Sequence, residues 1–337
     1  MSSSDPKSRT VVITGAAAGV GRAIAHRFAR AGDRIGLISR DGAALEVVKR
    51  ELQAYGAETE LEAVDVADAA ALFAAAERLE QKLGKIDIWV NDAMLTVFSP
   101  VSQITPEEFR RVTEVTYLGF VHGTMAALKS MRPRRVGRII QIGSALAYRG
   151  IPLQSAYCGA KHAIRGFSDS LRTELMHEKS RIQITIVELP AVNTPQFDWA
   201  RAHVPHSPRP MGRPVQPEVI ANAIYRVAAG RWREYWLGAP TILTILGDAV
   251  LPGVFDRYLA RTAFKGQQTA RLMPPHRRDN LEQPITDLHR VRGSYSDEAV
   301  ERAPLIAGEV ARVGIFAAVG LLAILLGAGF GRYRRRG

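Results

Sequence analysis

Near its N-terminus the chain carries a glycine-rich turn between a β-branched run and a helical pattern. Residues 10–14 (TVVIT) have the composition of a buried strand, and residues 22–31 have the apolar spacing of a helix. The turn from Gly15 to Gly21 reads GAAAGVG, and a second strand pattern follows at 34–39. Glycines permit a sharp turn and let a pyrophosphate approach the N–H groups that begin a helix. The chain is therefore predicted to open with a strand–helix–strand unit that binds a dinucleotide.

A second motif lies near the middle of the chain. Tyr157 and Lys161 are four residues apart in a helical stretch, so their side chains share one face. A nearby cation lowers the pKa of a tyrosine from its ordinary value of about 10 toward the range of a general acid or base. Ser144 ends the preceding apolar run and can donate a hydrogen bond to a substrate carbonyl oxygen. By itself, the Tyr–Lys spacing also fits an ordinary exposed helix face.

Taken together, these features resemble the short-chain dehydrogenase/reductase family. The matching features lie in that family's order over about residues 8–237: Thr14-Gly15-x-x-x-Gly19-x-Gly21, Asn91-Asp92-Ala93, Ser144, Tyr157 with Lys161, and Pro190 with Thr194. The resemblance implies a catalytic domain at 1–238 with a doubly wound parallel α/β sheet of about seven strands. It also implies reversible hydride transfer between a nicotinamide cofactor and a carbonyl or secondary alcohol.

Within this resemblance, each motif residue has an implied role. Tyr157 would exchange the proton, Lys161 would lower its pKa and bind the nicotinamide ribose, and Ser144 would polarise the substrate oxygen. The implied cofactor-binding residues are Gly15, Ala17, Gly19, Val20, Gly21, Ser39, Arg40, Asp65, Val66, Asn91, Ala93, Tyr157, Lys161, Pro190, Val192 and Thr194.

Arg40 indicates which nicotinamide cofactor to expect. It follows Ser39 at the end of the second predicted strand. An acidic residue at this point would bind the ribose hydroxyls of the adenosine, whereas a basic one suits a 2′-phosphate. We therefore expect NADP(H).

Several positions depart from the family pattern. Asp92 and Met94 stand where the family usually has asparagine and glycine, and Thr116 stands where an asparagine normally holds a proton-relaying water. We expect Thr116 to take part in catalysis, with slower or altered turnover. The same departures leave open a second interpretation, an NADP(H)-binding scaffold or sensor with little turnover.

The composition bounds the partners of this protein. Lysine and arginine outnumber aspartate and glutamate by 45 to 33, for a net charge of +12. Such an excess raises nucleic acid or an anionic membrane as partners, and a charge-driven adaptor is a third interpretation that predicts salt-dependent binding. No nucleic-acid-binding module is recognisable, and we expect no nucleic acid. His203 and His206 lack the carboxylates or cysteines that usually complete a metal site, so no metal is expected. The single cysteine, Cys158, suits a reducing compartment.

Beyond residue 238 the family pattern ends. Residues 239–273 have one apolar helical face, which could lie in a membrane interface, cap an apolar pocket or pack on the domain. Residues 274–312 are polar and rich in proline and charge, as in a linker. Residues 313–331 carry no charge and are long enough to cross a hydrocarbon core of roughly 30 Å, and the basic tail 332–337 follows. We expect a single C-terminal transmembrane helix; a buried core helix is the alternative.

The expected anchor bears on location and substrate. The terminal arginines favour a cytoplasmic tail, whereas a catalytic domain without a signal peptide should itself be cytoplasmic. We favour the second argument and expect a single-pass membrane protein whose catalytic domain is cytoplasmic. Apolar residues such as Phe197 and Trp199 near the expected pocket favour a lipophilic carbonyl or alcohol substrate. A homo-oligomer is left open.

Overall fold

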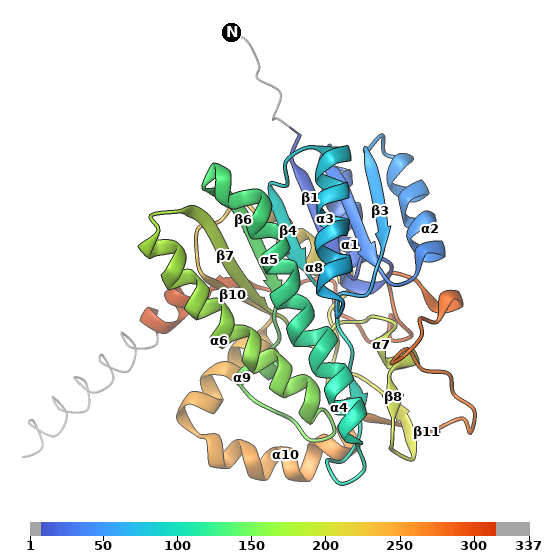
Figure 1. Cartoon of the computed structure of the whole chain (residues 1–337). Coiled ribbons are helices and arrows are strands. Elements are labelled where there is room, and N and C mark those ends of the chain that lie inside the picture. Colours follow the sequence, from blue (N-terminus) through green and yellow to red (C-terminus); the bar gives the residue numbers. More distant parts are fainter. Residues whose placement is uncertain (1–7, 315–337) are drawn as a thin grey trace, which may run out of the picture.

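Buried β-branched runs form the centre of the molecule. The computed structural model describes residues 8–314 (Figure 1). The run at Thr10–Thr14 is β1, and all five of its residues are buried, as expected for a strand covered on both faces. Eight strands form one sheet in the order β12-β10-β7-β6-β4-β1-β2-β3. The other strands are β2 (Arg34–Ser39), β3 (Thr59–Ala63), β4 (Ile88–Asn91), β6 (Val136–Ile142), β7 (Arg181–Glu188), β10 (Glu234–Leu237) and β12 (Leu305–Ala307).

The strand directions confirm the predicted α/β fold. Every neighbouring pair from β3 to β10 is parallel, and only β12 runs antiparallel to β10. The sheet therefore has the expected parallel strands and one added edge strand.

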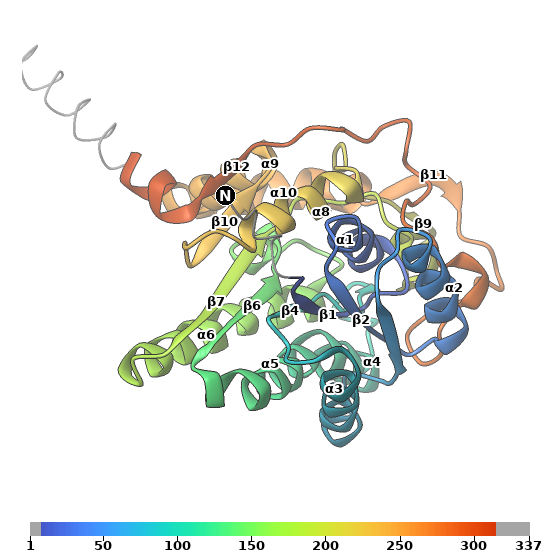
Figure 2. The ribbon, with the colours of Figure 1, turned by 90° about the horizontal axis from the view of Figure 1, so that it is seen from above.

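Helices cover both faces of the sheet (Figure 2). Two hydrophobic clusters lie between the sheet and these helices, one on each face. On one face lie α1 (Gly19–Ala29), α2 (Gly42–Gln53) and α8 (Pro217–Val227). On the other lie α3 (Ala69–Leu83), α4 (Pro106–Thr113), α5 (Gly119–Met131) and α6 (Ser155–His177). Three further turns are η1 (Glu114–Leu118), a π-helical segment, η2 (Arg132–Arg134) and η3 (Ala145–Ala147).

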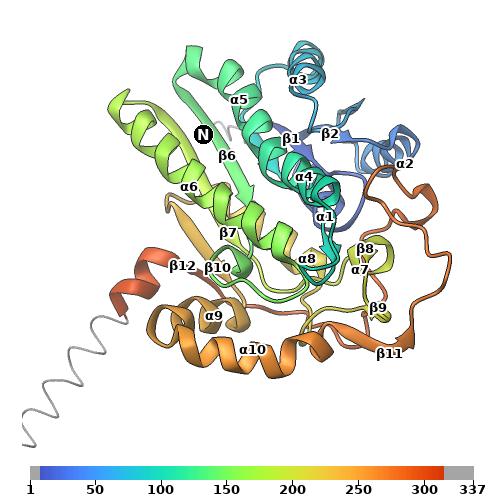
Figure 3. The same cartoon turned by 60° about the horizontal axis from the view of Figure 1, so that its bottom comes forward.

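Shorter elements gather below the carboxyl ends of the strands (Figure 3). They include α9 (Ala239–Val250) and α10 (Pro252–Gly266), which form the helical part of the expected 239–273 extension. β11 (Gln268–Leu272) pairs with β9 (His206–Pro208), and β5 (Val97–Phe98) pairs with β8 (Arg201–Ala202). α7 (Gln196–Trp199) lies beside them. Because ligands of such folds bind at the carboxyl ends of the strands, these elements enclose the expected site.

The prediction of a linker at 274–312 is wrong. This stretch packs across the domain, contains η4 (Thr286–Leu288), and supplies β12 to the sheet. Leu281 and Ile285 are buried, so the few apolar residues of the segment fall where they anchor it. Polar composition suggested a loose chain, but arginine side chains and backbone carbonyls pair with one another along this stretch.

The predicted transmembrane helix at 313–331 and the basic tail at 332–337 lie almost entirely outside the described residues. Between residues 8 and 314, no helix combines the length and the apolar character that crossing a bilayer requires.

Candidate active site

A cavity of about 590 Å³ lies at the carboxyl ends of the parallel strands. Segments far apart in the sequence meet there: the glycine turn after β1, the end of β2, the start of α6 and the loop after β7. Among the residues predicted to act in catalysis or cofactor binding, all line this cavity except Gly21, Asn91 and Thr116. The structure thus brings Ser144, Tyr157 and Lys161 to the same cavity as the glycine turn.

The glycine turn has the conformation that the sequence predicts. Gly15 and Gly19 have φ angles of 73° and 55°, a region that favours glycine. A Cβ atom on Gly15 would lie 2.9 Å from the backbone of Ala93, and one on Gly21 would lie 2.4 Å from the carbonyl oxygen of Gly15. Gly21 therefore packs against the backbone of Gly15 without lining the cavity, while the N-terminus of α1 faces the cavity. This cradle fits the pyrophosphate of a dinucleotide.

Tyr157 and Lys161 lie one helical turn apart at the start of α6. The Lys161 Nζ atom lies 5.5 Å from the centre of the Tyr157 ring and donates a 2.7 Å hydrogen bond to the carbonyl oxygen of Ile142. Lys161 is 2% exposed, whereas Tyr157 is half-buried in the cavity wall. The β6 carbonyl therefore fixes the ammonium beside the phenol ring.

The charge states of this pair differ from the expectation. Burial raises the pKa of Tyr157 above its ordinary value, and a hydrogen bond with Ser144 acts in the opposite direction. The sequence predicted that Lys161 would lower the pKa of Tyr157; in the structure burial instead raises it. Burial lowers the pKa of Lys161, while the carboxylates of Asp92 and Glu188 raise it.

Asp92, one of the departures from the family pattern, lines the cavity close to Lys161. Burial raises the pKa of Asp92, and the charge of Lys161 lowers it. At both groups burial outweighs the mutual attraction: the pKa of Asp92 is raised to about 7 and the pKa of Lys161 is lowered to about 8.

Ser144 follows β6 and lies in the cavity wall. Its Oγ accepts a 3.2 Å hydrogen bond from the backbone N–H of Leu146, which leaves its O–H to donate. Its own backbone N–H donates to the carboxylate of Glu188. Sequence reasoning missed Glu188; the only available signal was a carboxylate at the end of the apolar strand ITIVE.

Thr116 does not reach the cavity. It lies in η1, where its hydroxyl donates to the carbonyl oxygen of Leu95 and accepts from the N–H of the same residue, both at 2.9 Å. The structure thus gives Thr116 a structural partner, and its part in catalysis stays a prediction. This side chain holds the loop after β4 in place, and that loop lines the cavity.

Asn91 likewise lies behind the cavity. Its amide nitrogen donates to Gln141, Thr124 and the carbonyl oxygen of Phe120, and its oxygen accepts from Trp89. The side chain of Asn91 therefore ties β4 to β6 and α5. It makes no direct contribution to the cofactor cavity, in contrast to the expectation.

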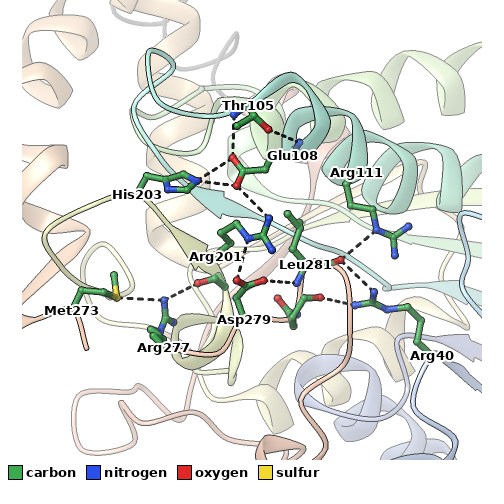
Figure 4. A network of polar contacts seen from close by, with 12 residues as sticks. Arg40, Thr105, Glu108, Arg111, Arg201, His203, Met273, Arg277, Asp279 and Leu281 are labelled. Atoms are coloured by element: carbon green, nitrogen blue, oxygen red, sulfur yellow. Dashed lines mark hydrogen bonds and ion pairs between the residues drawn. The ribbon is translucent and has the colours of Figure 1, made fainter. Parts of the chain in front are cut away.

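Arg40 lies at the expected adenosine end of the cavity, at the end of β2. Its guanidinium group donates to the backbone carbonyl oxygens of residues 280–282. Figure 4 shows the bond to Leu281. Asp65, also in the cavity wall, pairs with Arg111. The residue expected to read a 2′-phosphate is therefore present, and a segment distant in sequence holds it.

The opposite end of the cavity is apolar. α9 and α10 contribute aliphatic and aromatic side chains, and the loop after β7 contributes two more aromatic rings. The helices contribute Leu243, Phe255, Tyr258 and Leu259, and α7 contributes Phe197 and Trp199. The Trp199 ring also lies 5.3 Å from the ring of His289, so it reaches toward the adenosine end. Across residues 8–314, no group of three or more histidine, cysteine, aspartate or glutamate side chains is arranged to hold a metal.

Comparison with known families agrees with this geometry. A family model described as short chain dehydrogenase matches residues 9–204, more than half of the chain. The chain belongs to the short-chain dehydrogenase family. The members of this family are oxidoreductases, so the chain is an oxidoreductase of this family.

Similar short-chain dehydrogenases extend the match beyond the family model. An uncharacterized oxidoreductase, YxnA of Bacillus subtilis, is 29% identical over 322 residues, which cover 90% of each chain. Dehydrogenase/reductase SDR family member 7B of Bos taurus is 31% identical and covers 78% of this chain and 84% of its own. A 3-dehydrosphinganine reductase of Danio rerio is 31% identical over 56% of this chain and 57% of its own.

Solved structures of this family share the fold. An alcohol dehydrogenase of Thermococcus sibiricus complexed with 5-hydroxy-NADP superposes with a TM-score of 0.60 at 26% identity, over 68% of this chain and 96% of that one. A xylitol dehydrogenase bound to NAD⁺ superposes with a TM-score of 0.51 at 26% identity, over 54% of this chain and 69% of that one.

Proposed function

We propose that this protein is an NADP(H)-dependent oxidoreductase that interconverts a carbonyl and a secondary alcohol on a lipophilic substrate. The observation that carries the proposal is the single cavity in which Ser144, Tyr157 and Lys161 face the glycine turn. The bound nicotinamide would supply or accept the hydride. The reacting carbon would then lie between the cofactor and the three side chains.

In the reducing direction, Tyr157 donates its proton to the substrate oxygen. The raised pKa of Tyr157 keeps the phenol protonated at neutral pH, which suits a general acid. Ser144 donates a hydrogen bond to the same oxygen and polarises the carbonyl. Lys161, held by the carbonyl of Ile142, binds the nicotinamide ribose and stabilises the phenolate that remains. In the oxidising direction the proton returns to Tyr157.

Two observations support NADP(H). Arg40 lies at the end of β2, where a cation can bind a 2′-phosphate. The alcohol dehydrogenase of Thermococcus sibiricus, a structural neighbour, was solved with 5-hydroxy-NADP. The xylitol dehydrogenase neighbour binds NAD⁺, so fold alone does not select the cofactor and Arg40 carries this part of the proposal.

The substrate class follows from the apolar end of the cavity and from the surface around it. α9 and α10 line the cavity with Leu243 and Phe255, and they also expose Val250, Leu251 and Val254 to the outside. Apolar residues exposed on the helices that line a cavity favour a substrate delivered from lipid. The similarity to a 3-dehydrosphinganine reductase supports the same class.

The location is part of the same proposal. The uncharged residues 313–331 would anchor the protein in a membrane as a single span, with the catalytic domain in the cytoplasm. The anchor would hold the cavity mouth near the lipid that supplies the substrate.

Purified protein should be assayed with NADPH against a library of lipid carbonyls, in parallel with the Tyr157→Phe variant. The variant should lose turnover by at least about a thousandfold while it still binds NADPH, because only the proton donor is removed. Turnover in the variant at the wild-type rate would contradict the role of Tyr157. Activity confined to small polar sugars would contradict the substrate class.

A scaffold or sensor is the second candidate, and Asp92 favours it. This carboxylate lines the cavity where the family usually has asparagine, and the charge of Lys161 acts on its pKa. A scaffold predicts NADPH binding without turnover across the whole carbonyl library, so the same assay separates the two functions.

A further inference from the structure

The segment 277–293 crosses the adenosine end of the cavity and contacts both groups that would hold the phosphates of a cofactor. Arg40 donates to the carbonyl oxygens of Asn280 at 2.6 Å, Glu282 at 2.9 Å and Leu281 at 3.3 Å. Further along, the backbone N–H of Gly19 donates to the carbonyl oxygen of Arg290 at 2.9 Å. The same segment therefore contacts both the guanidinium group of Arg40 and the first turn of α1.

The segment is anchored at several points away from the cavity (Figure 4). Arg277 donates to the backbone carbonyl oxygens of Phe197, Asp198 and Ala200. Asp279 pairs with Arg201 at 3.0 Å. The side chain of Leu281 is 0% exposed and belongs to the core cluster under α3 to α6. These contacts fix the position of the three carbonyl groups that receive Arg40.

The segment forms a wall of the cavity without filling it. Asn280, Pro284, Ile285 and His289 line the cavity beside Ser39, Arg40 and Asp65. A guanidinium group has five N–H donors, and the three carbonyl groups accept from its two terminal nitrogens. Two donors, one on Nε and one on Nη2, therefore have no partner among the described residues.

We propose that the segment 277–293 is a working part of the cofactor site, which orients Arg40 toward the 2′-phosphate and covers the adenosine half of NADP(H). The proposal rests on the proposed preference for NADP(H) and assigns its specificity to the carbonyl groups of residues 280–282 together with Arg40. An arginine that is already held loses little side-chain entropy when a phosphate binds, so the bond to the phosphate is stronger. The segment acts through Arg40 and is therefore a positioning element.

Leu281→Ala tests the proposal, because Leu281 anchors the segment from the core and does not line the cavity. The matched control is Leu175→Ala, a leucine of the same core cluster on α6 that is 2% exposed. Dissociation constants for NADPH and NADH are measured for both variants. Leu281→Ala should weaken NADPH binding about tenfold and NADH binding less than about twofold, the loss of roughly one charge-assisted hydrogen bond. The control should change neither by more than about twofold.

A second comparison repeats the Leu281→Ala measurement in a protein that also carries Arg40→Ala. There, Leu281→Ala should no longer affect NADPH binding, because the segment acts through the missing guanidinium. An equal loss for NADPH and NADH, or an undiminished loss without Arg40, would overturn the proposal. Tighter NADPH binding by Leu281→Ala would also overturn it and would mean that the carbonyl groups compete with the phosphate.

If Leu281→Ala does not fold, Asp279→Ala removes a surface anchor of the same segment, and hydrogen exchange of the wild-type protein gives an independent measurement. NADPH should slow the exchange of amides 280–290 more than NADH does, because only NADPH engages Arg40. Equal protection by the two cofactors would refute the proposal. A protein that binds neither cofactor would instead refute the proposed function, so the two failures are distinguishable.

Discussion

The backbone N–H of Ser144 donates a 2.6 Å hydrogen bond to the carboxylate of Glu188, which is fully buried at the end of β7. Gly143 makes this approach feasible, because a Cβ atom there would lie 2.2 Å from the same carboxylate oxygen. The other oxygen, Oε1, has no hydrogen-bond partner within the described part of the chain, and the Nε atom of Arg165 lies 3.8 Å from it. The end of β7 therefore positions the serine that faces the cavity.

Glu188→Gln should make stability less sensitive to pH. Burial raises the pKa of Glu188 to about 8 from the ordinary 4.5. Between these values the folded wild-type protein retains a proton that the unfolded chain has released, so stability is lost as pH rises through this window. Glutamine does not ionise, so the variant should gain roughly 1 to 3 kcal/mol relative to wild type between pH 5 and pH 9. Urea unfolding at both pH values measures the difference; a difference that is equal at both would contradict the buried proton.

Asp92→Asn should move the basic limb of the pH–rate profile to lower pH. The charge of Asp92 raises the pKa of Lys161, against the lowering by burial. Without that charge the pKa of Lys161 falls, so the ammonium is lost at a lower pH. The profile of kcat/KM with NADPH measures the shift. A limb that stays in place would show that Lys161 does not control this part of the profile.

Gly21→Ala should abolish cofactor binding. The added methyl group would lie 2.4 Å from the carbonyl oxygen of Gly15, and backbone cannot yield as a flexible side chain does. Gly166→Ala on α6 is the control, since its Cβ meets nothing within 4 Å, and it should stabilise the protein by about 0.5 to 1 kcal/mol. Titration with NADPH and thermal unfolding of both variants check this. Normal NADPH binding by Gly21→Ala would show that the turn is not the cradle.

Thr116→Val should destabilise the protein by about 2 kcal/mol, because the N–H and the carbonyl oxygen of Leu95 both lose their partner in a buried place. Thr116→Ser keeps the hydroxyl and should lose less than half as much. Chemical unfolding of the two variants tests whether Thr116 acts by holding the loop after β4. Wild-type stability with reduced turnover in Thr116→Val would support the catalytic role expected from the sequence.

The sequence was most informative where local pattern determines structure. The strand at 10–14, the glycine turn and the four-residue spacing of Tyr157 and Lys161 depend on neighbours in the chain, and each was predicted correctly. The hydrogen bonds of Thr116 and Asn91 run to Leu95 and to other elements of the fold, which no spacing reveals.

The contact between Arg40 and the segment 277–293 could not be predicted for a related reason. Arg40 lies 240 residues before Asn280, and its partners are backbone carbonyl groups, which every residue carries. Composition therefore says nothing about this contact. Polar residues between 274 and 312 favoured a linker, and the burial of Leu281 and Ile285 is one feature that distinguishes this segment from one.

The antiparallel pairing of β12 with β10 has a mechanical consequence. The segment 277–293 is held by β-strands on both sides: β11 (Gln268–Leu272) precedes it and β12 (Leu305–Ala307) follows it. If the segment 277–293 moves away from the cavity to exchange a nucleotide, it remains attached to the domain at both of its ends. Its return is then an intramolecular step with first-order kinetics. Nucleotide release from this enzyme should therefore proceed at a rate that is independent of how much protein is present.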